Sequence, residues 1–142
     1  MTRIDLVVID GQNDFCASGN APESDGGRMG ALSVQGADEE AMRVADLISR
    51  LGEKLTRIHA TLDTHHYLDG SHHLAWQGTD GKAAPPFTLV THADVAAGKW
   101  MPSFKIGVWH GDELPAREWA LLYTQALEAS DRGPLCLWPV HC

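Results

Sequence analysis

Residues 4–9 read IDLVVI, a nearly continuous apolar run that is rich in β-branched side chains. This pattern is typical of a strand that is buried on both faces of a parallel sheet. Asp10 ends the run, and a loop rich in Gly, Ser, Asn and Asp follows as far as Gly36. We therefore expect a first buried strand here, with a carboxylate at its C-terminal end.

A helix and a second strand follow this loop. From Asp38 to Leu55 the apolar residues recur with helical spacing, and the acids at 38–40 suit the positive end of a helix dipole. Residues 57–62 then favour a second strand, which Asp63 closes. The pattern predicts a helix that returns the chain to a second strand beside the first.

Three more elements are predicted in the remainder of the chain. Residues 87–91 favour a third strand, and apolar residues at helical spacing over 119–127 favour a second helix. Pro115 lies near the start of that helix, where a missing N–H does no harm. Residues 135–138 read LCLW, a short buried strand. Alternation of strands and helices predicts an α/β fold with a parallel β-sheet flanked by helices.

Composition limits the classes of protein to consider. A chain of 142 residues suits one domain, and 44% hydrophobic with 21% charged residues suits a globular protein. The formal net charge of −8 argues against nucleic acid or an anionic membrane as partner. No apolar run approaches the roughly 20 residues that span a bilayer, so a cytoplasmic location is expected. Three cysteines without zinc-finger spacing predict free thiols.

Three reactive groups follow predicted strands. Asp10 follows the first strand, Asp63 the second and Cys142 the last. Because parallel α/β sheets bind ligands at the carboxyl ends of their strands, these groups are expected to meet at one edge. Cys142 is then a candidate nucleophile that needs a base or a cation to form its thiolate. The alternative is an inert cysteine at the end of a strand.

A histidine-rich segment follows Asp63. Four of the eight histidines lie between 65 and 73, as His65, His66, His72 and His73. Residues two apart in an extended segment point the same way, so Asp63 and His65 can bind one ion. Carboxylate with imidazole suits zinc, iron or manganese. A solvated polar loop is the alternative, and the cluster alone does not decide between the two.

Other candidate site residues carry weaker signals. Lys99 and Lys105 lie between the third strand and the second helix, although lysines are usually solvated surface groups. Phe15, Trp76 and Trp100 are candidates for the walls of an aromatic-ligand pocket, although aromatic side chains more often belong to a core.

Several motifs together resemble one known family. Residues 10–16 read DGQNDFC, which looks like the opening motif of the nicotinamidase and isochorismatase-like cysteine hydrolases. Residues 61–65, TLDTH, resemble their metal motif, and residues 138–142, WPVHC, resemble the nucleophile segment of the nicotinamidase branch. Residues 85–88 and 97–100 are similar to a longer subgroup of that branch. The resemblance covers essentially the whole chain in the right order.

The resemblance implies a fold and a set of catalytic residues. The fold would be three-layered and Rossmann-like, in one domain over residues 1–142. An Asp-Lys-Cys triad would comprise Asp10 as the base, Lys99 or Lys105, and Cys142 as the nucleophile that forms a thioester. The main-chain N–H groups of His141 and Cys142 would form the oxyanion hole, with a cis peptide before His141.

The resemblance also implies a metal and a substrate pocket. A divalent transition metal, zinc by preference and otherwise iron or manganese, would be bound by Asp63, His65 and either His72 or His73. That metal would bind the pyridine nitrogen of nicotinamide, and Phe15 would pack on the ring, with Trp76 a further candidate for the pocket.

The implied activity is hydrolysis of nicotinamide to nicotinate and ammonia, within NAD salvage and pyridine nucleotide metabolism. The alternatives are hydrolysis of another small amide or an isochorismatase-like substrate, and a non-catalytic member that binds a ligand or oligomerises. Members of the family continue beyond the cysteine, so the chain is expected to lack its C-terminal part and to be weakly active as it stands. A homo-oligomer is expected by resemblance only.

Overall fold

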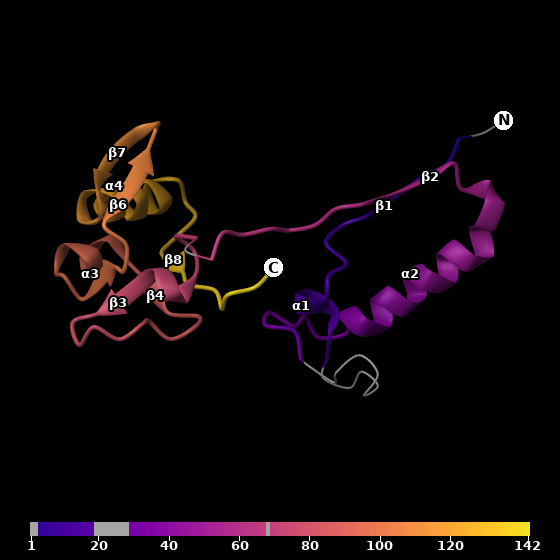
Figure 1. Cartoon of the computed structure of the whole chain (residues 1–142), viewed down its shortest axis with the longest axis horizontal. Helices are drawn as coiled ribbons and strands as arrows, with labels where there is room; N and C mark the ends of the chain where they lie inside the picture. Colours follow the sequence, from indigo (N-terminus) through magenta and orange to yellow (C-terminus); the bar gives the residue numbers. More distant parts are fainter. Residues whose placement is uncertain (1–2, 19–28, 68) are drawn as a thin grey trace. The chain divides into compact units, whose positions relative to one another are not determined.

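The computed structural model describes residues 3–18, 29–67 and 69–142. Its contacts divide the chain into two compact units. The first unit comprises Met1–His65 with His141–Cys142, and the second comprises His66–Val140. Both units are shown in Figure 1.

The first unit contains a parallel pair of strands. β1 (Asp5–Val8) pairs with β2 (Arg57–Ala60) in a register that sets Leu6 beside Ile58, and Figure 1 shows the two strands running side by side. Between them the chain forms α1 (Asn13–Cys16), α2 (Ala37–Leu51) and a short 3-10 helix (Gly52–Lys54). The predictions of both strands and of the helix are confirmed, with the α-helix ending at Leu51.

Apolar side chains of the first unit line an open groove. No described residue of β1, β2 or α2 is buried, and Val7 is 55% exposed. The groove, with a volume of about 730 Å³, is lined by Val44 and Ile48 of α2 and by Val8 and Ile58 of the strands. The expectation that β1 is buried on both faces is therefore wrong, because within the described residues α2 faces these strands across the groove instead of packing closely on them.

The second unit is built from short elements. In chain order they are a 3-10 helix (His73–Ala75), β3 (Trp76–Gly78), β4 (Leu89–Val90), α3 (His92–Ala96), β5 (Trp100–Pro102), β6 (Ile106–Trp109), β7 (Asp112–Pro115), α4 (Ala116–Ala129) and β8 (Leu135–Cys136). The pairs β3–β5, β4–β8 and β6–β7 are all antiparallel. The helix predicted around 119–127 corresponds to α4, and its N-cap residue is Pro115.

The α/β class is confirmed, but the topology of the described strands differs from the prediction. Only β1 and β2 are parallel, and the strands predicted at 87–91 and 135–138 appear as β4 and β8, which pair antiparallel. Each of these two strands has only two residues, and Phe87, just before β4, has a positive φ of 64°. This left-handed residue turns the chain, so the extended segment is shorter than its β-branched composition predicts.

The hydrophobic core that the described residues form lies in the second unit. Its fully buried members include Trp76 of β3, Val90 of β4, Val95 of α3, Ala120 of α4 and Leu137. Residues from β3, β4, α3 and α4 thus pack in a common core, which holds together strands too short to be stable as isolated pairs. Among the described residues, no helix has the length and apolar character needed to cross a membrane.

Candidate active site

The C-terminal ends of β1 and β2 are fastened together by side chains. Asp10 follows β1 with a φ of 51°, a left-handed conformation that aspartate adopts more readily than most residues. The hydroxyl of Thr61 donates to Asp10 Oδ1 at 2.7 Å and accepts from the Asp10 main-chain N–H at 3.1 Å. The carboxylate predicted to serve as base is thus engaged by the hydroxyl that follows β2.

Gln12 fixes the segment that carries the predicted metal motif. Its amide Nε2 donates to the main-chain oxygen of Asp63 at 3.0 Å, and its Oε1 accepts from the Asp63 N–H at 2.5 Å. This two-way contact resembles a rung of a β-ladder, and it holds residue 63 beside the loop after β1. Because both strands end here, the motifs at 10–16 and 61–65 lie together, as the sequence predicts for the carboxyl ends of parallel strands.

A carboxylate and two imidazoles gather within the first unit. His65 Nε2 lies 3.0 Å from Asp63 Oδ2, and His141 Nε2 lies 3.7 Å from the same oxygen. The rings of His65 and His141 have centroids 4.8 Å apart. The side chain of His141 is only 5% exposed, and Phe15 contacts its ring edge-on with centroids 5.6 Å apart. These donors are of the types that zinc, iron and manganese prefer.

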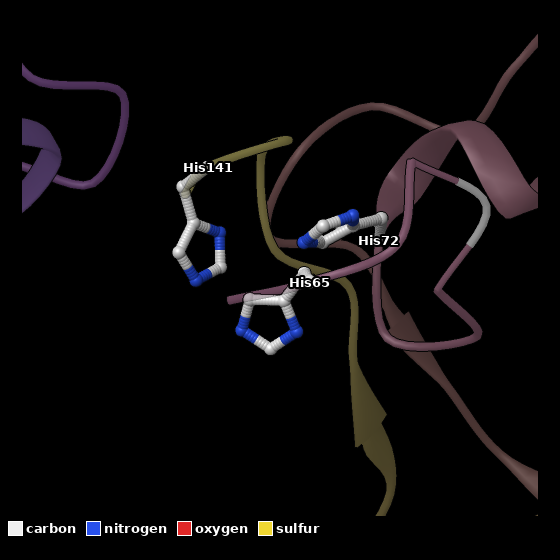
Figure 2. A group of neighbouring side chains, drawn as sticks. All are labelled: His65, His72 and His141. Carbon is white, nitrogen blue, oxygen red and sulfur yellow. The ribbon is translucent and has the colours of Figure 1, made fainter. Parts of the chain in front are cut away.

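Two histidines of the first unit are close enough to share a metal ion. Figure 2 shows the imidazoles of His65 and His141, and one ligand nitrogen of each lies within 4.8 Å of the other. In the second unit His72 is fully buried, and His73 Nδ1 lies 2.8 Å from the main-chain oxygen of Ala84. Within the first unit the paired imidazoles are thus compatible with a metal cofactor.

Cys142 is fixed by contacts on both sides of its peptide unit. Its main-chain N–H donates to Asp14 Oδ2 at 2.6 Å, and its oxygen accepts from the N–H of His65 at 3.2 Å. It borders a cleft of about 480 Å³ whose other lining residues are Gly11, Gln12, Asn13, Asp14 and Leu62. Asp14, on the four-residue helix α1, is therefore the carboxylate in direct contact with the candidate nucleophile.

The surroundings of Cys142 favour the neutral thiol. Burial raises the pKa of Cys142, and the negative charges of Asp14, Asp63 and Asp10 raise it further. Conversely, the N–H of Cys142 lowers the pKa of Asp14 by donating to its carboxylate. At neutral pH the sulfur is thus protonated beside an ionised acid, and a nearby cation would be needed to favour the thiolate.

Substitution of Asp14 by asparagine is expected to make Cys142 react faster. Asparagine keeps an oxygen for the N–H of Cys142 but removes a negative charge, so the thiol pKa falls and the thiolate fraction at pH 7–8 rises. Alkylation by iodoacetamide, followed at the Cys142 peptide by mass spectrometry, should accelerate several-fold, with its pH profile displaced to lower pH.

The matched control is Asp46→Asn, which removes an exposed carboxylate of α2 that pairs with Arg50. This variant should alkylate Cys142 at the wild-type rate. An unchanged or slower rate in Asp14→Asn would show that the charge of Asp14 does not hold the thiol in its neutral form.

Comparison with protein-family models, curated proteins and solved structures gives no match for this chain. The likeness of its motifs to nicotinamidases therefore stays a prediction.

Several predicted site residues belong to the second unit and have partners there. Lys99 Nζ lies 3.1 Å from Asp94 Oδ1, and Lys105 is exposed, with its main-chain oxygen accepting from the N–H of Ala116. Trp76 is fully buried in the core. Its ring belongs to the interior of the second unit, and its place in a substrate pocket stays a prediction.

The structure corrects one backbone prediction and adds residues that the sequence did not assign. No peptide bond of the described residues is cis, so the cis peptide expected before His141 is wrong. The sequence does not predict the contacts of Asp14, Gln12 and Thr61, although Gln12 and Asp14 belong to the DGQNDFC motif. The sequence also predicts no role for the His141 imidazole, as distinct from its N–H group, although its place beside Cys142 is an available signal.

Proposed function

We propose that this protein is a metal-assisted cysteine amidohydrolase that converts nicotinamide to nicotinate and ammonia. The observation that supports the proposal is the gathering of Asp14, Asp63, His65 and Cys142 at the ends of two parallel strands in one unit. A nucleophile, a carboxylate and a set of metal donors are the groups that this reaction requires. The proposal includes a three-layer Rossmann-like fold, in which β1 and β2 would be two strands of the parallel sheet.

The reaction would proceed through a thioester. The thiol proton of Cys142 passes to a carboxylate, and the sulfur attacks the amide carbon. Collapse of the tetrahedral species breaks the C–N bond, and the same proton leaves with the nitrogen as ammonia. Water then attacks the thioester, giving nicotinate and regenerating the thiol. Asp14 contacts Cys142, so we assign the proton transfer to Asp14, whereas the resemblance assigns it to Asp10.

The oxyanion of the tetrahedral species needs main-chain donors. The predicted donors are the N–H groups of His141 and Cys142. In this structure the Cys142 N–H donates to Asp14, so it becomes available to an oxyanion only when the carboxylate releases it. Protonation of Asp14 by the thiol weakens that contact, because a neutral acid is a poorer acceptor than a carboxylate. Deprotonation of the nucleophile would thus free the donor that the next step needs.

A divalent cation held by Asp63, His65 and a further histidine would supply positive charge close to Cys142 and a binding position for a ring nitrogen. Its charge would offset the three carboxylates that raise the pKa of the thiol. A requirement for metal is therefore part of the proposal.

The test is ammonia release from nicotinamide by the purified chain. Protein is first treated with chelator and then supplied with zinc, iron(II) or manganese. Steady release that depends on metal supports the proposal, with benzamide, which lacks the ring nitrogen, as a matched poor substrate. Absence of release with each metal would contradict it, and equal turnover of both amides would point to a different small amide.

A further inference from the structure

The side chain of Gln12 pairs with the main chain of Asp63. Its Nε2 donates to the Asp63 oxygen at 3.0 Å, and its Oε1 accepts from the Asp63 N–H at 2.5 Å. A primary amide is a neutral side-chain group that carries a donor and an acceptor side by side, as a peptide unit does. Gln12 is the N-cap residue of α1, and its amide reaches Asp63 in place of capping that helix. Gln12 therefore pairs with residue 63 as a neighbouring strand would.

This pairing continues the contacts between β1 and β2 beyond the end of their ladder, which lies at Ala60 on β2. The next residue, Thr61, donates its N–H to the main-chain oxygen of Val8 at 2.9 Å, and its hydroxyl accepts from the Asp10 N–H at 3.1 Å. The amide of Gln12 adds its contacts two residues further along. The chain after β2 is thus held beside the loop after β1 by main-chain, hydroxyl and amide groups in succession.

The same two segments hold the main chain of Cys142 between them. The N–H of His65 donates to the Cys142 oxygen at 3.2 Å, and the Cys142 N–H donates to Asp14 Oδ2 at 2.6 Å. His65 lies two residues after Asp63, and Asp14 lies two residues after Gln12. The hydrogen bonds and the two short segments therefore close a ring that includes the main chain of the candidate nucleophile.

One side of this ring is braced from outside, and the other depends on the amide. The main-chain oxygens of Asp14 and Phe15 in α1 accept from the N–H groups of Leu32 and Val34, at 3.1 and 2.8 Å. On the other side, both main-chain hydrogen-bonding groups of Asp63 are engaged by the amide. Loss of the amide would thus release the ring at residue 63 while α1 stays in place.

We infer that Gln12 is a positioning residue, which fixes the main chain of Cys142 through Asp63 and His65. The inference rests on the proposed function for its effect on turnover, but its effect on the Cys142 main chain can be measured without a substrate. Displacement of a reacting group by about 1 Å costs about 100-fold in rate. A side chain that closes the ring around the nucleophile is therefore expected to matter for turnover.

The test uses Gln12→Met, which keeps an unbranched side chain of similar length but removes the donor and the acceptor. Native-state hydrogen exchange is followed by NMR on the whole chain. The N–H groups of His65 and Cys142 should exchange about 10-fold faster than in the wild type. The N–H of Thr56, which donates to the Ile4 oxygen at 2.7 Å at the opposite end of the strand pair, should keep its wild-type rate.

The matched control is Gln35→Met, the same substitution at an exposed position of the first unit, which should leave all these rates unchanged. Faster exchange at Asp63, with His65 and Cys142 unchanged, would overturn the inference, because the amide would then hold only its own partner. Equal acceleration at Thr56 would also overturn it, because the substitution would then loosen the whole unit.

A measurement on the wild-type chain covers the case in which the variant does not fold. If the ring opens as one element, the Nε2 protons of Gln12 and the N–H of Cys142 exchange through the same opening. Their exchange rates should then rise with urea concentration along the same slope. Different slopes for the two groups would contradict the inference.

Turnover separates this inference from the proposed function. In Gln12→Met, kcat for ammonia release should fall by about 100-fold with KM near the wild-type value, because the position of Cys142 acts on the chemical step. A raised KM with unchanged kcat would instead assign Gln12 to substrate binding and overturn the inference. Exchange that depends on Gln12 in a chain that releases no ammonia would leave the positioning role and remove the amidohydrolase. Ammonia release with wild-type kcat and wild-type exchange in Gln12→Met would do the reverse.

Discussion

Cys142→Ser is expected to abolish ammonia release from nicotinamide, with a loss of at least about 10³-fold in kcat. A serine hydroxyl is far harder to deprotonate than a thiol, and the three carboxylates that already raise the thiol pKa would oppose an alkoxide still more. The volume and the main-chain contacts of residue 142 are kept, so zinc affinity should change little. Steady-state ammonia release and zinc calorimetry on the same preparation measure the two effects.

Cys136→Ser and Cys16→Ser are the matched controls. Cys136 belongs to β8 in the second unit, and Cys16 ends α1 in the first. Both are free cysteines with partly buried side chains, as Cys142 is. If the proposed nucleophile is right, both variants keep wild-type turnover. Activity that survives in Cys142→Ser but falls in either control would show that the nucleophile is another cysteine.

The first unit shows which features of a fold the sequence can predict. The apolar run at residues 4–9 and the apolar residues at helical spacing after Asp38 correspond to β1 and α2. Burial could not be predicted in the same way, because the sequence pattern shows which faces are apolar but not which partner covers them. Ile58, which lines the open groove, and Val7 are examples of apolar residues that stay exposed.

The second unit contains strands that the sequence pattern did not indicate. β6 and β7 are joined by His110 and Gly111, whose φ values of 50° and 93° are both positive, as a type I′ hairpin turn requires. Asparagine or aspartate before glycine is the usual signal of this turn, and histidine in that place conceals it. Strands of two to four residues are also too short for an alternating pattern to stand out.

The residues of the candidate site that follow predicted strands were predictable from the sequence. The residues whose position depends on a single helical turn were not. Asp10, Asp63 and Cys142 were expected together because each follows a predicted strand. The carboxylate that contacts Cys142 is that of Asp14, whereas the sequence predicted Asp10. The difference depends on α1, a helix of four residues that the sequence motif does not predict. Side-chain direction in so short a helix is set by neighbouring contacts, which no spacing rule captures.

Trp76→Ala is expected to destabilise the second unit by about 3–5 kcal/mol, the usual cost of deleting a buried aromatic side chain. Trp76 is fully buried, and its ring lies against that of Trp119 with centroids 6.3 Å apart. Its Nε1 donates to the main-chain oxygen of Gly70 at 2.7 Å, so the variant loses both packing and a hydrogen bond. Urea unfolding, followed by far-UV circular dichroism, measures the change in the free energy of unfolding. The dependence of that free energy on urea concentration is compared between the variants.

Trp138→Ala provides the matched control, because the same side chain is removed from a position that is 39% exposed. Trp138 contacts Phe87 edge-on, with centroids 6.1 Å apart, and its ladder contacts to Ser71 and His73 use main-chain atoms that alanine retains. Its loss should therefore cost only about 1 kcal/mol, near the average for a point substitution. Equal costs at the two positions would mean that the centre of the second unit is not packed around Trp76, and that its short strands depend on other contacts.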